Sequence, residues 1–167
     1  MAEKDTVLKE VFKHKGIGDI REFYNFMYRW LGAEDFSITE KQYNEKINGD
    51  VKDLEIKWES KKELTDYFRA EIEMVTKVRG MKTIEIEVDG KRLKTNEFQE
   101  LEITFKAVLV KDYSSKWEHS GLQKFFKELY QKYIIPSRTE AMEIKTMKYV
   151  QDLKNDIKKF FDLEARK

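Results

Sequence analysis

The stretch Ile84-Glu-Ile-Glu-Val-Asp-Gly-Lys-Arg-Leu93 decides the fold of this chain. Apolar and charged residues alternate on both sides of Asp89-Gly90, which is typical of strands that bury one face. Asp-Gly tolerates the two positive φ angles of a type I′ turn and so predicts a hairpin with a two-residue loop. In that register Ile86 lies opposite Leu93. The stretch therefore predicts an antiparallel sheet with one buried face and one solvated face.

The alternation of apolar and charged residues continues on either side of this hairpin. It predicts further strands over 36–47, 53–59, 67–78 and 101–109. The segment 6–14 has apolar residues at helical spacing but β-branched and aromatic content typical of a strand, and we interpret it as a strand because Gly16 and Gly18 end it early. Gly80 is expected to mark the bend that leads into the hairpin. Glu71 and Glu73 occupy outward positions, where we expect them in solvent among lysines. Together these segments predict a curved antiparallel sheet of six to seven strands.

Two helices frame the sheet in the sequence. Asp19 and Glu22 form a capping-box pattern before a helix that runs to Leu31, and Gly32 is placed to end it. Pro136 suits the first turn of a second, long helix over 137–163, whose apolar residues recur at helical spacing. The fold class is therefore α+β, with the sheet packed on a long C-terminal helix.

A third helix is predicted over 122–135, because apolar residues recur there with a helical period after a candidate cap at Ser120. Its apolar stripe consists of Leu122, Phe125, Phe126, Leu129, Tyr130 and Tyr133, and all but Tyr130 are the candidate docking surface. Such a stripe either packs on the sheet or docks on a membrane or a partner protein. Of these alternatives we expect packing on the sheet.

Composition limits the classes of function. The 167 residues predict a single domain over 1–167, with 117–136 as an extra helical segment. The net charge is only +1, which predicts no nucleic-acid partner. The chain has no cysteine, and we expect neither a metal site nor a cofactor. No apolar run is long enough to span a bilayer, so the expected location is the cytoplasm. Many lysines and glutamates and a single proline are typical of a heat-adapted source.

The order of strand, helix, antiparallel strands and long C-terminal helix is similar to the helix-grip architecture of the START and pollen-allergen-like superfamily. The resemblance implies a curved sheet that wraps the terminal helix and encloses an apolar cavity. The chain also looks like an uncharacterised archaeal family of hypothetical proteins, a likeness that implies no function. That likeness lies in Trp30-Leu31, Ile56-Lys-Trp58 and Asp66-Tyr-Phe68.

Bulky inward residues are the candidate lining of such a cavity. The predicted pocket residues are Phe23, Met27, Trp58, Phe68, Met74, Phe105 and Val150, with Tyr43, Ser60 and Thr95 as polar candidates. The same bulky residues also fill a solid core well, and that alternative stays open. The leading hypothesis is a non-catalytic module that binds a hydrophobic small molecule or lipid. The alternative is a peripheral membrane or protein-interaction module that docks through the helix over 122–135.

The sequence offers little for catalysis. His14 and His119 are the residues with acid–base chemistry near neutral pH, and we expect both on the solvated surface without metal ligands nearby. The carboxylate pairs Glu71 with Glu73 and Glu85 with Glu87 fit a solvated strand face better than an active site. Nucleophile-elbow, phosphate-loop and dinucleotide-binding patterns are lacking. The sequence therefore predicts no catalytic residue, and it does not predict the oligomeric state.

Overall fold

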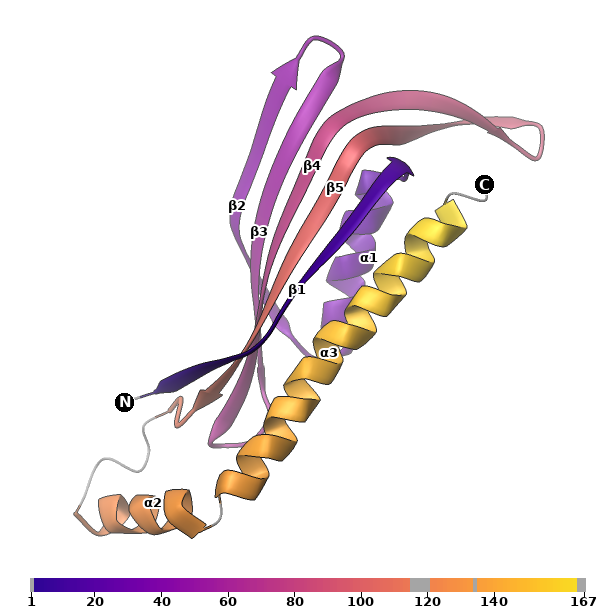
Figure 1. The fold of residues 1–167 in the computed structure, drawn as a ribbon. Coiled ribbons are helices and arrows are strands. Elements are labelled where there is room, and N and C mark those ends of the chain that lie inside the picture. The colour runs from indigo at the N-terminus through magenta and orange to yellow at the C-terminus, as the bar shows by residue number, and fades with distance from the viewer. Residues whose placement is uncertain (1, 115–120, 134, 165–167) are drawn as a thin grey trace.

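The structure is a computed structural model that describes residues 2–114, 121–133 and 135–164. Its elements in chain order are β1 (Glu3–Ile17), α1 (Ile20–Ala33), β2 (Ser37–Asn48), β3 (Val51–Glu63), β4 (Phe68–Val88), β5 (Lys91–Lys111), α2 (Gly121–Tyr133) and α3 (Ile135–Glu164). The strands form one antiparallel sheet in the order β1-β5-β4-β3-β2 (Figure 1). The fold class is α+β, and the order of elements is the predicted one.

The hairpin of β4 and β5 is the centre of the sheet. Asp89 and Gly90 have φ angles of 50° and 78°, as the type I′ turn requires. The pairing of Ile86 with Leu93 is confirmed, together with that of Val88 with Lys91 and of Ile84 with Thr95. The same register continues to the base of the hairpin. The local chemistry of one turn therefore sets the alignment of both long strands.

The predicted number of strands is not confirmed, because the described sheet has five strands rather than six or seven. Segments that we predicted as separate strands before and after Gly80 are both parts of β4. Gly80 has a φ of 64° and bends the ribbon, but Arg79 pairs with Glu100 before the bend and Lys82 with Glu97 after it. The ladder therefore resumes in the same register, and the outer part of the hairpin curves away from the other strands (Figure 1).

The helix starts agree with the sequence. The Asp19 carboxylate accepts a 3.1 Å hydrogen bond from the backbone N–H of Glu22, so Asp19 caps α1 as predicted. Pro136 lies in the first turn of α3, also as predicted. Ser120, the predicted cap of α2, lies outside the described residues.

The end of α1 differs from the prediction that Gly32 stops the helix. The helix continues to Ala33, and the left-handed residue is Asp35, with a φ of 63°. The N–H of Phe36 donates to the carbonyl of Leu31 at 3.0 Å, and the N–H of Asp35 donates to that of Gly32 at 3.1 Å. This pair of hydrogen bonds is a Schellman motif, in which an aspartate replaces the usual glycine. Leu31 and Phe36, the two residues joined by the longer-range bond, are both buried in the core cluster.

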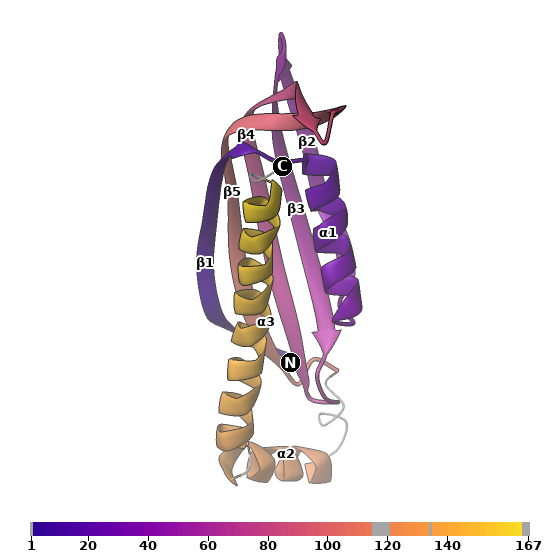
Figure 2. The ribbon, with the colours of Figure 1, turned by 90° about the vertical axis from the view of Figure 1, so that its right-hand side faces the viewer.

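α1 and α3 lie together on the concave face of the sheet (Figure 2). The core fills the space between them and the strands. α3 contributes Val150, Leu153, Ile157 and Phe161, which recur at helical spacing on one face and are fully buried. Burying a side chain of this size stabilises the fold by roughly 1.5–3 kcal/mol. The long helix is therefore held mainly by this single stripe.

The outer face of the sheet corrects one prediction. Glu71, expected in solvent, has only 1% of its side chain exposed. Its carboxylate lies 2.7 Å from the Arg69 guanidinium and 3.4 Å from the Lys4 ammonium. The Arg69 guanidinium in turn lies over the Tyr113 ring, with 5.2 Å between their centres. Long side chains thus cover this end of the outer face, and periodicity alone does not reveal such a cover.

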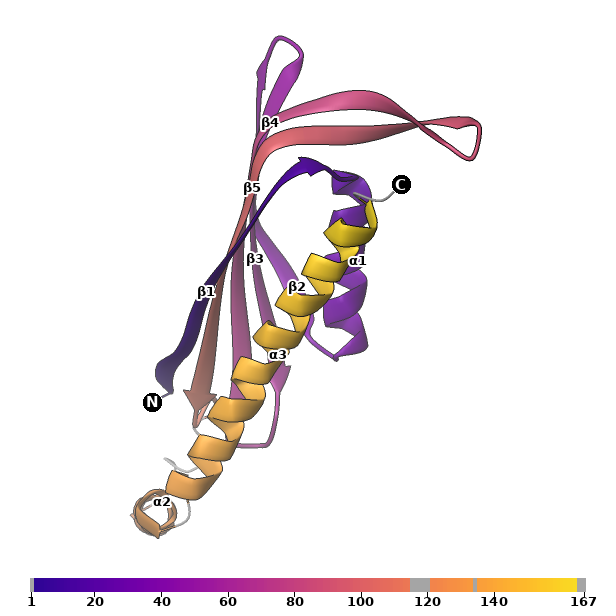
Figure 3. The same cartoon turned by 45° about the vertical axis from the view of Figure 1, so that its right-hand side comes forward.

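α2 corrects a second prediction. It lies beyond the N-terminal end of α3 (Figures 1 and 3), and its apolar stripe does not pack on the sheet. The exposed stripe residues are Leu122, Phe125, Phe126, Leu129 and Tyr133. Of the predicted stripe, Tyr130 packs against Tyr67, and Lys127 on the neighbouring side pairs with Asp112.

Candidate functional site

A cleft of about 690 Å³ lies between the start of α1, the hairpin of β2 and β3, and the bent part of β4 and β5. We call it the α1 cleft. Its apolar lining comes from Ile20, Leu54, Ile56 and Met81. Its polar lining comes from Arg21, Tyr24, Asn25, Tyr43, Glu45, Lys52 and Asn96. The cleft combines an apolar floor with several polar groups, at a volume within the ~300–1,000 Å³ typical of small-molecule sites.

The register of β2 and β3 explains the sheet wall of the α1 cleft. Tyr43 pairs with Ile56 and Glu45 pairs with Leu54, so the four side chains lie on one face. Lys52 precedes Leu54 by two residues and shares that face because side chains alternate along a strand. One ladder therefore brings aromatic, charged and aliphatic groups together.

The opposite wall is the first part of α1. Residues three and four positions apart on a helix share a side, which places Arg21, Tyr24 and Asn25 along the cleft. Asn96 of β5 fixes the start of this helix, because its side-chain oxygen accepts a 3.2 Å hydrogen bond from the N–H of Ile20. Its backbone carbonyl also accepts a 2.9 Å hydrogen bond from the N–H of Gly18. The wall is thus anchored to the bent part of the central hairpin.

Tyr24 is held as a rigid part of this wall. Its hydroxyl donates to the Glu40 carboxylate at 2.6 Å, and the indole N–H of Trp58 donates to the same oxygen at 2.9 Å. The Tyr24 and Trp58 rings meet edge to face, 4.8 Å apart. Burial, with a smaller effect from the hydrogen bond to Glu40, raises the pKa of Tyr24 to about 12. Tyr24 therefore stays protonated at neutral pH and offers the cleft its ring rather than a reactive oxygen.

The carboxylate in the cleft is already engaged. The Tyr43 hydroxyl donates to Glu45 at 2.9 Å, and the Lys52 ammonium lies 3.7 Å from the same carboxylate. Burial, followed by the hydrogen bond to Glu45, raises the pKa of Tyr43. Both tyrosines of the cleft are consequently neutral near pH 7. Neither tyrosine therefore presents an ionised oxygen to the cleft at that pH.

Arg21 is the cation of the cleft that remains available. Within the described part of the chain its guanidinium forms neither an ion pair nor a hydrogen bond, and the same holds for the Asn25 side chain. A guanidinium carries five N–H donors in a planar fork that fits carboxylate or phosphate oxygens. The rim of the α1 cleft can therefore receive an anionic group.

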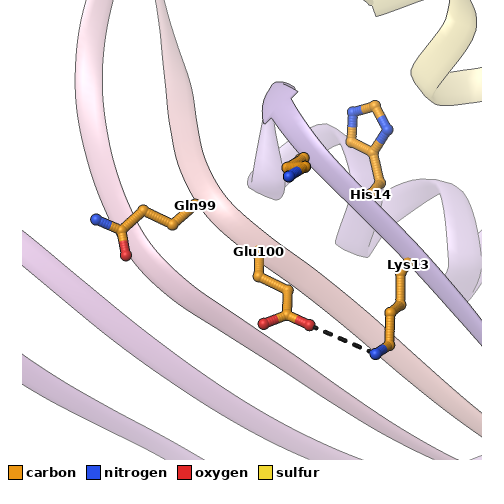
Figure 4. Close-up of a pocket in the computed structure, with 5 residues that line it drawn as sticks. Lys13, His14, Gln99 and Glu100 are labelled. Atoms are coloured by element: carbon orange, nitrogen blue, oxygen red, sulfur yellow. Dashed lines mark ion pairs between the residues drawn. The ribbon is translucent and has the colours of Figure 1, made fainter.

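A second pocket, of about 590 Å³, lies where the end of β1 meets β5. Its lining is Lys13, His14, Lys15, Gln99 and Glu100. Figure 4 shows that Lys13 extends toward Glu100 on one side of β1 while the His14 ring points to the other side. The Lys13 ammonium and the Glu100 carboxylate are 3.9 Å apart. Because its polar groups do not converge, this pocket is the weaker candidate.

His14 is not the solvated surface histidine that we predicted. Its ring is half-buried and stacks on Phe161 with 4.5 Å between ring centres, and Phe98 meets it edge-on. Burial is the main cause that lowers its pKa, and a backbone hydrogen bond with Ile17 and the charge of Asp162 oppose that effect. Nε2 is buried without a hydrogen-bond partner in the described chain. The other histidine, His119, lies outside the described residues.

The residues predicted to line a cavity are all buried among other core side chains. They are Phe23, Met27, Trp58, Phe68, Met74, Phe105 and Val150. None of them lines the α1 cleft or the pocket at His14, so a cavity among them stays a prediction. Of the polar candidates, Tyr43 lies in the α1 cleft. Ser60 instead donates to the carbonyl of Ile72 at 3.2 Å, and the Thr95 hydroxyl is buried without a partner in the described chain.

The other candidate groups do not form a site. Glu85 and Glu87 are exposed on the outer part of the hairpin, as predicted. The described residues contain no cluster of histidines and carboxylates that could hold a metal ion. No helix among the described residues is both long and apolar enough to cross a bilayer.

Most of the α1 cleft was missed by reasoning from the sequence. Arg21, Asn25 and Asn96 look like ordinary surface residues in their local patterns, and no motif connects them. The one available signal was Tyr43, a large aromatic residue in the polar strand β2. No family model, curated protein or solved structure matches the chain.

Proposed function

We propose that this protein is a non-catalytic binding module for a small amphipathic molecule that carries an anionic group, and that the molecule binds in the α1 cleft. The observation that carries the proposal is the position of Arg21, whose guanidinium has no partner in the described chain, at the rim of an apolar floor. The apolar part of the ligand lies on Leu54, Ile56 and Met81. The anionic group pairs with Arg21.

The charge of the cleft supports an anion rather than a cation. Glu45 is its single carboxylate, and that group is already engaged by Tyr43 and Lys52. A cationic ligand would have to displace Lys52 and would meet Arg21. An anionic ligand meets a free guanidinium and displaces nothing. Hydrogen bonds between charged groups are about twice as strong as neutral ones, so this difference favours the anion.

Two ligands of matched shape test the proposal. Octanoate and octan-1-ol share an apolar chain, but only octanoate is charged at neutral pH. The chain has six methionines, and methyl-labelled methionine reports their surroundings by NMR. We expect saturable binding of octanoate that shifts the Met81 methyl signal, identified with Met81→Leu. The Met27 and Met74 signals come from the core and should not move.

Arg21→Gln should weaken octanoate binding on the order of tenfold, because one charge-assisted hydrogen bond is lost. The same change should leave octan-1-ol binding unaltered. Arg29→Gln is the matched control, since Arg29 is an exposed arginine of the same helix that does not line the cleft.

Two results would count against the proposal. Shifts at Met27 and Met74 without a shift at Met81 would place the ligand in the core, among the residues predicted from the sequence. Absence of saturable binding of either ligand would remove the small-molecule function altogether.

A further inference from the structure

Five side chains of the α2 stripe stay exposed in the described chain, and we keep the name stripe for these five. The five side chains of Leu122, Phe125, Phe126, Leu129 and Tyr133 are between 38% and 69% exposed. The rings of Phe125 and Phe126 touch each other edge to face, 5.9 Å apart, rather than packing on the sheet. Contiguous exposed apolar side chains of this size mark interaction sites in soluble proteins.

α2 is held in place without using this stripe. The Lys127 ammonium lies 2.6 Å from the Asp112 carboxylate at the end of β5, in a contact that is largely buried. The Tyr130 ring meets the Tyr67 ring edge to face, 5.7 Å apart. Both contacts come from a side of the helix next to the stripe. The helix is thus anchored to the fold while its apolar side remains free.

The position of α2 suits contact with an extended surface. The helix lies across the end of the molecule, beyond the N-terminal end of α3 and away from the bent part of the central hairpin (Figures 1 and 3). Neither the sheet nor α1 projects past it in these views. α2 therefore lies at the outer end of the described fold in these views.

The charges around α2 are mainly positive. α2 contains Lys124, Lys127 and Lys132 with one acidic residue, Glu128, and Arg138 follows at the start of α3. Of these, Lys127 is already paired with Asp112. The whole chain has a net charge of +1, so the rest of the chain is net negative. The Lys132 ammonium lies over the Tyr133 ring at 5.4 Å, beside the apolar stripe. Lys124 and Lys132, with Arg138 nearby, thus leave a small surplus of positive charge at the helix that exposes the aromatic side chains.

We propose that α2 docks on the surface of an anionic lipid bilayer, with its stripe in the interface and its basic side chains among the headgroups. Helices that lie in a membrane interface typically carry phenylalanine, leucine and other apolar residues on one side and lysines on the other. α2 has this pattern. The negative surface of a bilayer attracts such lysines. A second copy of the chain fits less well, because it would bring two positive helices together. This proposal is independent of the small-molecule site.

Vesicle cosedimentation tests the docking. The full chain should bind vesicles of phosphatidylcholine mixed with phosphatidylserine and should bind phosphatidylcholine vesicles only weakly. Added salt should reduce the binding, because it screens the attraction between lysines and headgroups.

The double change Phe125→Ser and Phe126→Ser should lower vesicle affinity by about tenfold or more, since two large apolar side chains leave the interface. Its thermal unfolding midpoint should stay that of the parent, because both rings are exposed. Ile47→Ser with Leu93→Ser is the matched control, since these apolar residues are equally exposed but lie in the two hairpins. That control should bind vesicles like the parent.

Charge reversal tests the lysines separately. Lys124→Glu with Lys132→Glu should abolish the preference for anionic vesicles, whereas Lys148→Glu with Lys158→Glu, on exposed positions of α3, should weaken binding much less.

The proposal is overturned if the parent does not bind anionic vesicles, or if the phenylalanine variant binds as well as the parent. Analytical ultracentrifugation gives a further test. The proposal is also overturned if the parent is a dimer, the phenylalanine variant is a monomer, and the two bind vesicles equally well. A large loss of thermal stability in the variant would place the stripe in the core and would likewise refute docking. Octanoate binding should persist in every α2 variant, which separates a failure here from a failure of the α1 cleft.

Discussion

The Lys127 ammonium and the Asp112 carboxylate form a 2.6 Å ion pair that joins α2 to the end of β5, and Asp112 is only 2% exposed. Asp112 also has a positive φ of 53°, a conformation that aspartate and asparagine tolerate better than most residues. The contact is therefore a specific anchor rather than a surface ion pair of negligible effect.

Lys127→Met should release α2 from this anchor, because it leaves a buried carboxylate without a counter-ion. We expect a loss of about 1–3 kcal/mol of stability and faster amide hydrogen exchange in α2. The pair Asp112→Asn with Lys127→Met should recover part of the loss, since asparagine keeps the backbone conformation and carries no charge. Urea unfolding with hydrogen exchange measures both effects, and equal losses in the single and double variants would show that the unpaired Asp112 charge is not what destabilises the Lys127 variant.

The turn at Gly90 gives a second prediction. Gly90 has a φ of 78°, and an added Cβ would meet no atom within 4 Å, so any cost of substitution comes from the backbone alone. Gly90→Val should destabilise the protein by about 1–2 kcal/mol, whereas Gly90→Asn should cost much less. Thermal unfolding of the two variants checks this, and equal midpoints would contradict the type I′ geometry.

Gly80 provides a contrasting case for a third prediction. It also has a positive φ, 64°, but a Cβ there would lie 2.7 Å from the Gln99 side chain. Gly80→Ala should therefore cost more than Gly90→Ala, because crowding adds to the backbone strain. Combining Gly80→Ala with Gln99→Ala should remove the crowding and leave the strain. If Gly80→Ala alone is no worse than Gly90→Ala, the bend does not have the packing described.

The strand pattern was predictable wherever local chemistry decides it. Asp89-Gly90 defines its turn without help from the rest of the chain, and the register follows from it. Gly80 differs, because its role in the fold depends on a contact with a neighbouring strand. Its N–H donates to the Asp53 carboxylate at 2.9 Å, so a neighbouring strand satisfies the backbone at the bend. Seen in the sequence alone, Gly80 resembles the end of a strand, and this accounts for the strands that were counted separately.

The candidate sites were less predictable because they depend on what lies opposite each residue. The stripe of α2 is evident in the sequence. Periodicity shows that one face of the helix is apolar, but it does not show which part of the fold covers that face. The α1 cleft combines a helix start, two strands and the bent hairpin. Arg21 becomes notable only when α1 lies beside Leu54 and Ile56, a relationship that local patterns do not contain.

The environment of His14 gives the last prediction, on pH. Burial lowers the pKa of the folded-state imidazole below the ordinary value of 6.5, while the unfolded chain keeps that value. As pH falls below about 6.5, the unfolded chain takes up a proton that the folded protein resists, so the stability contributed by neutral His14 is lost. Asp162 opposes this loss, because its charge favours the imidazolium.

His14→Phe should keep the stacking on Phe161 and remove the titration. Between about pH 5 and 7.5 most carboxylates stay ionised, so the parent should lose stability toward the acid end and the variant should lose less. Urea midpoints across that range measure the difference. Asp162→Asn should steepen the loss in the parent background, since it removes the charge that favours protonation. Parallel pH profiles for the parent and His14→Phe would show that the buried imidazole does not control stability in this range.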